Sequence, residues 1–153
     1  MTLLLTLAVI TTASACQHQR STFSEQRQLP AEGWDHTMSL AFTPQYADSL
    51  TPVDITLAVR HDQHYSFTTL QLVVDIIGDD GTVDRKHVAL PVADTHGHWL
   101  GSGFGTLYQC HATLVKGVAP DKARHIVVWQ CTTDSIPLTH VNDISVTVQP
   151  HNN

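Results

Sequence analysis

Apolar and polar residues alternate along several short segments of the chain, and this pattern constrains the fold more than any other feature. Every second residue of 53–59 is Val, Ile or Leu, and 143–148 alternates in the same way. The stretch 70–77 is longer and more apolar, as expected of a central strand. Successive side chains of a β-strand point to opposite faces, so a period of two predicts strands that bury one face.

Strand-like segments recur at fairly regular spacing along the chain. Turns rich in Gly, Pro, Asp and Asn separate them, and no segment holds a helical period over ten residues. Such a pattern is typical of an all-β chain that folds as a single antiparallel β-sandwich. It leaves jelly-roll and immunoglobulin-like strand orders open. The predicted strands are 38–42, 53–59, 70–77, 83–90, 108–116, 124–131 and 143–148.

The first residues have the form of an export signal. An apolar run at 3–10 is followed by the small residues of 11–15 and then by Cys16. The run is too short to span a bilayer as a helix, and the arrangement is typical of a bacterial lipoprotein signal that is cut before an acylated cysteine. No Lys or Arg precedes the run, so the alternative is a plain secretory signal that leaves an ordinary cysteine.

These features divide the chain into three parts. Residues 1–15 are predicted to be the signal peptide, 16–32 a polar tether to the lipid on Cys16, and 33–149 the β-sandwich domain. A first edge strand at 22–28 is the alternative interpretation of the tether.

The chain is acidic, with 14 Asp and Glu against 8 Lys and Arg, which gives a formal net charge of −6. Proteins that bind nucleic acid neutralise its phosphates with clustered Lys and Arg. Because this chain has no basic stripe, nucleic acid is not an expected partner.

Two cysteines remain if Cys16 carries lipid, and an oxidising compartment would favour their pairing. Cys110 and Cys131 flank the loop 117–122, and an antiparallel hairpin centred on that loop would place them opposite each other. Directly opposed residues are close enough for a disulfide, so a Cys110–Cys131 bond is possible. The alternative is a pair of buried free thiols.

The stretch 94–105 has four glycines within nine residues, which indicates unusual backbone conformations or close chain approach. A phosphate-binding loop does not fit, because no strand–turn–helix unit surrounds the glycines. We expect a crossover between the two sheets that Trp99 and Phe104 hold in place.

Two histidine pairs, His61 with His64 and His96 with His98, have spacings that could serve a metal ion. Neither pair has an evident third ligand apart from adjacent loop aspartates, so we predict no metal and no other cofactor. The carboxylates are dispersed and no nucleophile has a recognisable base, so we predict no catalytic residues.

Large aromatic residues could instead form a flat platform for sugars. Trp34, Trp99, Tyr108 and Trp129 are the candidates, and packing in the core is the competing use of such side chains. We expect Trp129 inside, because it alternates with Val127 and Cys131.

Three features together resemble the gliding-motility lipoproteins of the GldH family, which occur across Bacteroidota. They are the dipeptide Gly33-Trp34, the strand pair with the turn 79–81, and the stretch 94–105, and the likeness runs from about residue 33 to 148. The most specific part of the stretch consists of Asp94, Gly97, Trp99, Leu100, Gly101, Gly103, Phe104 and Gly105.

The resemblance implies an acylated envelope protein, with palmitate or a similar fatty acid on Cys16, that works beside the gliding motor and the linked secretion apparatus. It implies a place on the periplasmic side of the inner or outer membrane or on the cell surface. The expected partners are the membrane, through the lipid, and other motility or secretion proteins of the envelope. The family has no established enzymatic activity, so we expect a non-catalytic role. A carbohydrate-binding module of the envelope is the alternative, and it requires Trp34 and Trp99 to be exposed.

Overall fold

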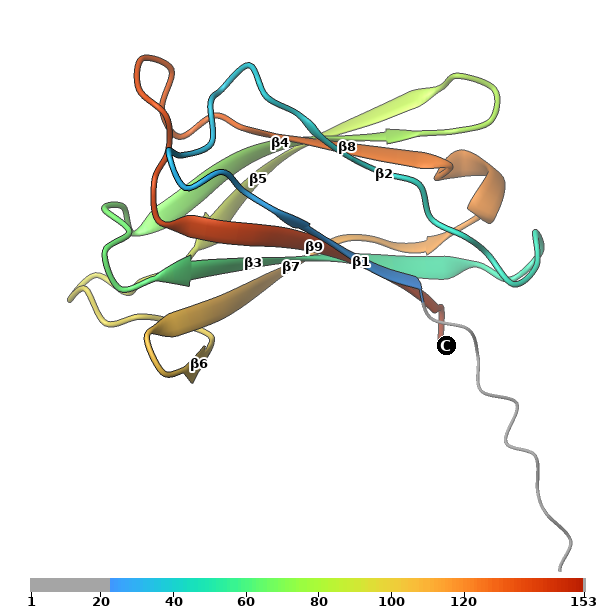
Figure 1. Ribbon diagram of the computed structural model, residues 1–153. Helices are drawn as coiled ribbons and strands as arrows, with labels where there is room; N and C mark the ends of the chain where they lie inside the picture. The colour runs from blue at the N-terminus through green and yellow to red at the C-terminus, as the bar shows by residue number, and fades with distance from the viewer. Residues whose placement is uncertain (1–22, 153) are drawn as a thin grey trace, which may run out of the picture.

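The structure is a computed structural model that describes residues 23–152 (Figure 1). Within these residues the strands form two antiparallel sheets that pack face to face, joined by loops and one short 3-10 turn. The predicted signal peptide and Cys16 lie outside the described residues. The elements are β1 (Phe23–Gln28), β2 (Leu40–Phe42), β3 (Val53–Asp62), β4 (Thr69–Ile77), β5 (Val83–Pro91), β6 (Ser102–Phe104), β7 (Leu107–Val118), η1 (Pro120–Lys122), β8 (His125–Gln130) and β9 (Val141–Pro150).

The strand order is that of a jelly roll. One sheet has the order β1-β9-β3-β7-β6 and the other the order β2-β8-β4-β5. Apart from β6, the strands pair in a nested way, β1 with β9, β2 with β8, β3 with β7 and β4 with β5. Such nesting arises when one long folded hairpin wraps around a core. The structure therefore confirms the predicted antiparallel sandwich and selects the jelly-roll order over the immunoglobulin-like one.

The core lies between the two sheets, because alternate side chains of each long strand point inward. Ile55, Leu57 and Val59 of β3 are completely buried, and they meet Ile126 and Val128 from β8 of the opposite sheet in the same apolar cluster. Burying one such side chain contributes roughly 1.5–3 kcal/mol, so these faces drive the two sheets together.

The sandwich begins earlier than predicted. β1 pairs with β9 over its whole length, with Phe23 opposite Val148 and Gln28 opposite Asp143. The alternative of an edge strand at 22–28 therefore describes this segment better than a tether over 16–32, and the described domain starts at 23 rather than at 33. An edge strand needs little apolar alternation, because its backbone ladder joins it to the sheet, and so it resembles a linker in sequence.

The predicted hairpin around 117–122 is wrong. β7 belongs to the five-stranded sheet and β8 to the four-stranded one, and η1 carries the chain from one to the other. The backbone N–H of Arg124 donates to the carbonyl of Ile77 (2.8 Å), which directs the chain into the second sheet. The apolar runs on either side of the loop are strands as expected, but nested pairing gives each of them a different neighbour.

Four loops gather at the end of the sandwich where β3 ends and β9 begins, which is the left side of Figure 1. We call this the loop end; it comprises 29–39, 63–68, 92–101 and 131–140. Backbone hydrogen bonds join the loops, from Trp34 N–H to the Leu138 carbonyl (2.9 Å) and from Val92 N–H to the Thr68 carbonyl (2.9 Å). The first residue of β1 lies at the opposite end, where Phe23 pairs with Val148 near the end of β9.

Candidate functional site

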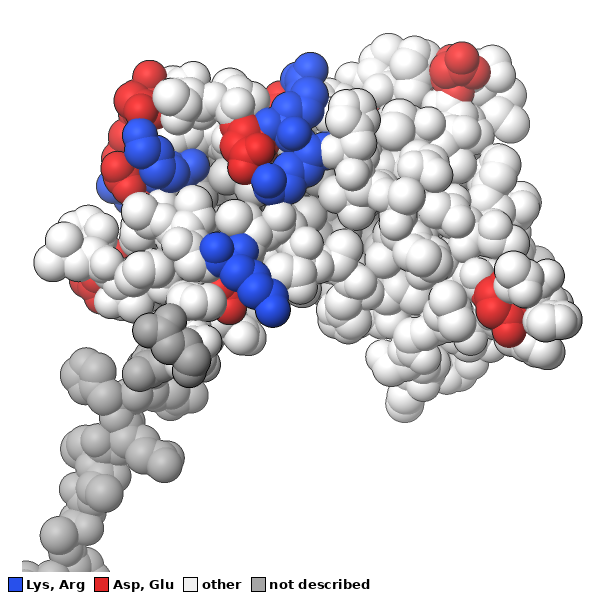
Figure 2. Space-filling view, turned by 180° about the vertical axis from the view of Figure 1, so that it is seen from behind, with Lys and Arg blue, Asp and Glu red and all other residues white. Residues whose placement is uncertain are grey.

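The loop end differs in composition from the rest of the domain. Its four loops contain five histidines and no Lys or Arg. Figure 2 shows isolated acidic side chains on the right, where the loop end lies, whereas Lys and Arg gather with Asp and Glu over the other part of this face. The ionisable side chains of these four loops are therefore mostly imidazoles and carboxylates.

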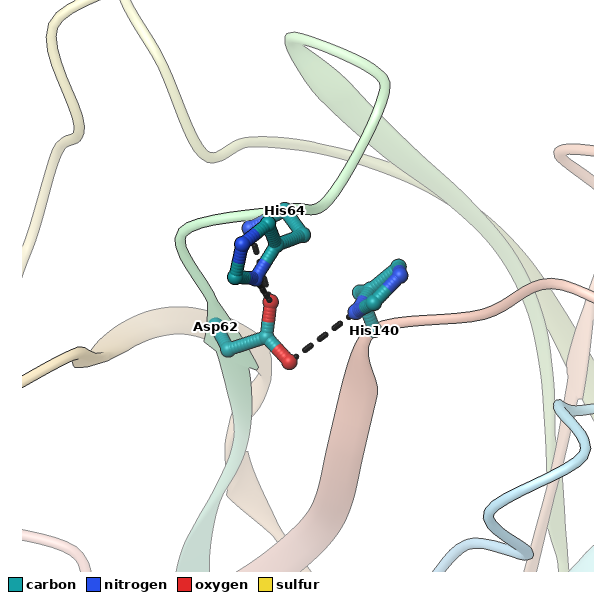
Figure 3. A group of neighbouring side chains, drawn as sticks. All are labelled: Asp62, His64 and His140. Carbon is teal, nitrogen blue, oxygen red and sulfur yellow. Dashed lines mark hydrogen bonds and ion pairs between the residues drawn. The ribbon is translucent and has the colours of Figure 1, made fainter.

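Asp62, His64 and His140 converge on one point of this surface (Figure 3). Nδ1 of His140 donates to one carboxylate oxygen of Asp62 (3.0 Å), and Nδ1 of His64 lies 3.3 Å from the other oxygen. The backbone N–H of His64 also donates to Asp62 (2.7 Å). Two histidines that are far apart in sequence thus flank a single carboxylate.

The backbone at these residues is held from both sides. The N–H of Asp62, the last residue of β3, donates to the carbonyl of His140 (3.1 Å), which ties the start of β9 to the end of β3. His140 has a φ of 67° and is the one non-glycine residue with positive φ among residues 23–152. That conformation costs roughly 1–3 kcal/mol, and it persists because the surrounding hydrogen bonds determine it.

Burial raises the pKa of the Asp62 carboxyl, but hydrogen bonds from His140 and from the backbone and side chain of His64 outweigh this effect. The net result is a pKa below the usual value. Asp62 is therefore an anion at neutral pH and presents negative charge to both imidazoles.

A second group, Asp94, His96 and His98, lies on a single exposed turn. The Asp94 carboxylate accepts the backbone N–H groups of His96 (2.8 Å) and His98 (2.9 Å) and the Nδ1–H of His98 (2.9 Å). The side-chain hydrogen bond from His98, followed by that from its backbone, lowers the pKa of Asp94. Gly97, at a φ of 83°, completes the turn.

His61 lies beneath this surface and is completely buried. Its Nδ1 donates to the carbonyl of Asp62 (3.0 Å), and its Nε2 has no hydrogen-bond partner among the described residues. The ring packs against Trp99 (4.8 Å between centroids), Tyr65 (5.5 Å) and Tyr108 (5.7 Å). Burial lowers the pKa of His61, so its imidazole is neutral at neutral pH. His61 does not converge with His64, whose neighbours in the group are Asp62 and His140.

The stretch 94–105 crosses from β5 in one sheet to β6 in the other. Trp99 holds it in place against His61 and Tyr108. Gly101 has a φ of 78°, and a Cβ there would lie 2.1 Å from the carbonyl oxygen of Gln109, so the crossover requires glycine at this position.

Phe104 is not an anchor of the crossover, contrary to expectation. It lies at the tip of the hairpin between β6 and β7 and is 90% exposed. Leu100 is also exposed, and its carbonyl accepts a hydrogen bond from the Cys110 thiol (3.4 Å). A shallow hollow of about 220 Å³ adjoins the hairpin. Its walls are Arg60, Ser102, Gly103, Phe104, Leu107, Tyr108 and Gln109.

The structure has Cys110 and Cys131 as free thiols, Cys110 buried and Cys131 exposed, rather than as the possible disulfide. The physical reason is the nested topology, since Cys110 lies on β7 and Cys131 follows β8 of the other sheet. Burial raises the pKa of both thiols. Neither is an activated nucleophile.

The sugar platform does not form from Trp34 and Trp99. Trp34 is completely buried, and its Nε1–H donates to the carbonyl of Met38 (2.9 Å). Trp129 was expected inside but is only partly buried, because the alternate residues Ile126 and Val128 occupy the inner face of β8.

Reasoning from the sequence singled out His64 but missed His140. The spacing of His61 and His64 drew attention to this turn, yet the ring that joins His64 comes from the far end of the chain. No local signal marks His140, since it reaches Asp62 only through the pairing of β9 with β3.

The fold and the loop end together define a class of protein: a small jelly-roll domain that groups histidines with aspartates on the loops at one end. None of the described residues forms a helix that is long and apolar enough to cross a membrane. The chain belongs to the GldH lipoprotein family, whose profile matches residues 21–148. It is accordingly a lipid-anchored protein of the cell envelope in the context of gliding motility, and the family is not a known enzyme family.

Among the curated proteins none matches the chain. Two solved structures from infectious bursal disease virus, of the VP2 subviral particle and of the Gx strain, are similar at 16% sequence identity with TM-scores of 0.34 and 0.33. The matches cover 86% of this chain but only 31% and 30% of the viral chains, so the chain spans about a third of their length.

Proposed function

We propose that this protein is a non-catalytic, lipid-anchored component of the gliding-motility machinery or of the secretion apparatus linked to it. The observation that carries the proposal is the family match over residues 21–148, which covers nearly all of the described domain. The loop end supports it, because the exposed groups there suit recognition of a partner.

The position of β1 indicates how the domain would be oriented relative to the membrane. Only residues 17–22 separate Cys16 from the start of β1, and a stretch of this length reaches at most about 25 Å. Acylation of Cys16 would therefore keep the β1 end of the sandwich close to the bilayer. β3, with ten residues, extends about 33 Å from that end to the loop end, which would face away from the lipid.

The surface proposed to contact other envelope proteins is the β6–β7 hairpin with the crossover that precedes it. Phe104 at the hairpin tip and Leu100 in the crossover are exposed apolar side chains, and Phe104 lines the hollow together with Tyr108. Large aromatic side chains are enriched where proteins meet, since each buries much apolar surface at low entropic cost.

Fractionation of cells tests the lipid anchor. The Cys16→Ala protein should leave the membrane fraction and appear in the soluble envelope fraction. A Cys16→Ala protein that stays with the membrane without an acyl group would contradict the anchor.

In-cell photo-crosslinking tests the surface. A photoreactive residue at position 104 should capture motility or secretion proteins, and one at position 50 should not, since Leu50 is equally exposed (86%) but lies in the loop between β2 and β3. Equal capture at both positions, or capture of glycan alone from position 104, would contradict the proposed surface.

A further inference from the structure

We propose that Asp62, His64 and His140 bind a divalent first-row transition metal ion, with Zn²⁺ as the expected ion. The proposal is independent of the motility role, because it rests only on the side chains drawn in Figure 3.

The donor atoms already have nearly the spacing that such a site needs. The Nδ1 atoms of His64 and His140 lie 3.3 Å and 3.0 Å from the two oxygens of Asp62, and the three ligand atoms lie within 4.8 Å of one another. Tetrahedral Zn²⁺ with bonds of about 2.0–2.2 Å separates its ligand atoms by roughly 3.4 Å. Rotations of the side chains alone can therefore close the site around an ion.

The donor set selects the class of ion. Two imidazole nitrogens with one carboxylate suit Zn²⁺ and its neighbours, whereas Ca²⁺ and Mg²⁺ prefer sites made of oxygen atoms. Three protein ligands leave the fourth tetrahedral position for water or for a donor from another molecule. On binding, the metal takes the place of the Nδ1 protons that the two rings share with Asp62. A neutral ring moves that proton to Nε2, whereas a charged ring releases it to solvent and keeps its second proton on Nε2.

The backbone positions the ligands before any ion arrives. The Asp62 carboxylate accepts the N–H of His64 (2.7 Å), and the Asp62 N–H donates to His140 (3.1 Å). His140 adopts a left-handed conformation that a side chain rarely takes, and this conformation turns its ring toward Asp62. A ligand set drawn from two segments that are 78 residues apart, one at the end of β3 and one just before β9, is more rigid than one drawn from a single turn.

The group of Asp94, His96 and His98 is the weaker candidate and serves as the control. Its three residues lie on one exposed turn, the side chain of His98 is 80% exposed, and the hydrogen bonds to Asp94 are those of an ordinary turn.

The experiment is a titration of the full-length protein, purified in detergent without a histidine tag, with Zn²⁺ in competition with a chromogenic chelator. Stoichiometric binding is expected in the wild type. His140→Gly removes the ligand and also relieves the positive φ, so this variant should fold at least as well as the wild type. Its affinity should fall by more than the roughly 10–100-fold that loss of an outer-shell partner costs.

His64→Ala should weaken binding as His140→Gly does, and His98→Ala should leave the affinity unchanged. Co²⁺ in place of Zn²⁺ should show the visible absorption of tetrahedral nitrogen and oxygen coordination, and His140→Gly should abolish it. Binding below one ion per chain would overturn the proposal. So would a loss of affinity in His98→Ala with none in His140→Gly.

Discussion

The turn between β4 and β5 and the loop end hold their carboxylates differently. In that turn, at the end opposite the loops, Asp80 pairs with Lys122 and Asp79 with Arg124, so permanent cations occupy these two acidic groups. At the loop end, Asp62 and Asp94 pair with histidines. A carboxylate paired with Lys or Arg contributes to solubility and local structure, and its oxygens are already occupied by a permanent cation. A carboxylate paired with imidazoles shares an exchangeable proton with them, so the group as a whole can bind a further ligand.

The largest expected effect tests whether the loop end tolerates an added side-chain atom less well than the turn at the opposite end. Gly101 and Gly81 have similar φ values of 78° and 76°, but a Cβ would strike the Gln109 carbonyl only at Gly101 and meets nothing within 4 Å at Gly81. Gly81→Ala should lower the free energy of unfolding by about 1–2 kcal/mol, the cost of the left-handed conformation. Gly101→Ala should lower it by about 3 kcal/mol or more, because the clash is added.

Urea unfolding of both variants measures this difference. Equal losses of unfolding free energy in the two variants would show that the crossover can move away from Gln109. The loop end would then adapt to an added side chain more easily than its contacts indicate.

The second prediction follows from the proposed metal site and separates the two ends directly. Zn²⁺ at 100 times its dissociation constant should stabilise the wild type by about 2.7 kcal/mol and should leave His140→Gly unchanged. Amide hydrogen exchange should slow around residues 62–65 and 138–141 and stay the same at the turn 78–82. Protection at both ends would indicate non-specific binding.

A smaller effect concerns an ion pair away from the loop end. Arg85 donates to both oxygens of Asp75 (2.6 Å each), whose side chain is only 8% exposed, while the guanidinium stays in contact with water. These hydrogen bonds hold the pKa of Asp75 below its usual value. Their stabilisation is therefore complete above about pH 4 and is lost as the pH falls through the lowered pKa.

Asp75→Asn should lower the free energy of unfolding at pH 7 by about 1–2 kcal/mol. In this variant the free energy of unfolding should also fall less steeply as the pH is lowered. Urea midpoints between pH 2 and pH 7 would measure both effects, the range being that in which carboxylates titrate. If the urea midpoints of the variant and the wild type fell equally with decreasing pH, Asp75 would be paired equally well in the unfolded chain.

The smallest expected effect is at the hairpin tip. Phe104→Ser and Leu50→Ser should each change the free energy of unfolding by less than about 0.5 kcal/mol, since both side chains are almost fully exposed. Only Phe104→Ser should reduce capture of envelope partners in pull-down experiments. A large loss of stability in Phe104→Ser would show that the ring packs in the folded protein and is not a free contact surface.

Local pattern was sufficient for the strands themselves. The predicted segments 53–59, 70–77, 83–90 and 143–148 all lie inside β3, β4, β5 and β9. The turn at 79–81 joins β4 to β5 as a hairpin, with Gly81 in the left-handed conformation. Alternation and turn chemistry act between neighbours in the chain, so the sequence by itself determined the all-β class and the elements of the sandwich.

Tertiary structure alone decided which strands become neighbours and which faces turn inward. Both faces of β8 are partly apolar, so its alternation could not distinguish Trp129 from Val128 as the buried set. Nested pairing separated Cys110 from Cys131 and brought His140 to Asp62, because a strand's partner depends on the path of the whole chain. The period of a strand records which side chains share a face, but it carries no information about which distant strand will cover that face.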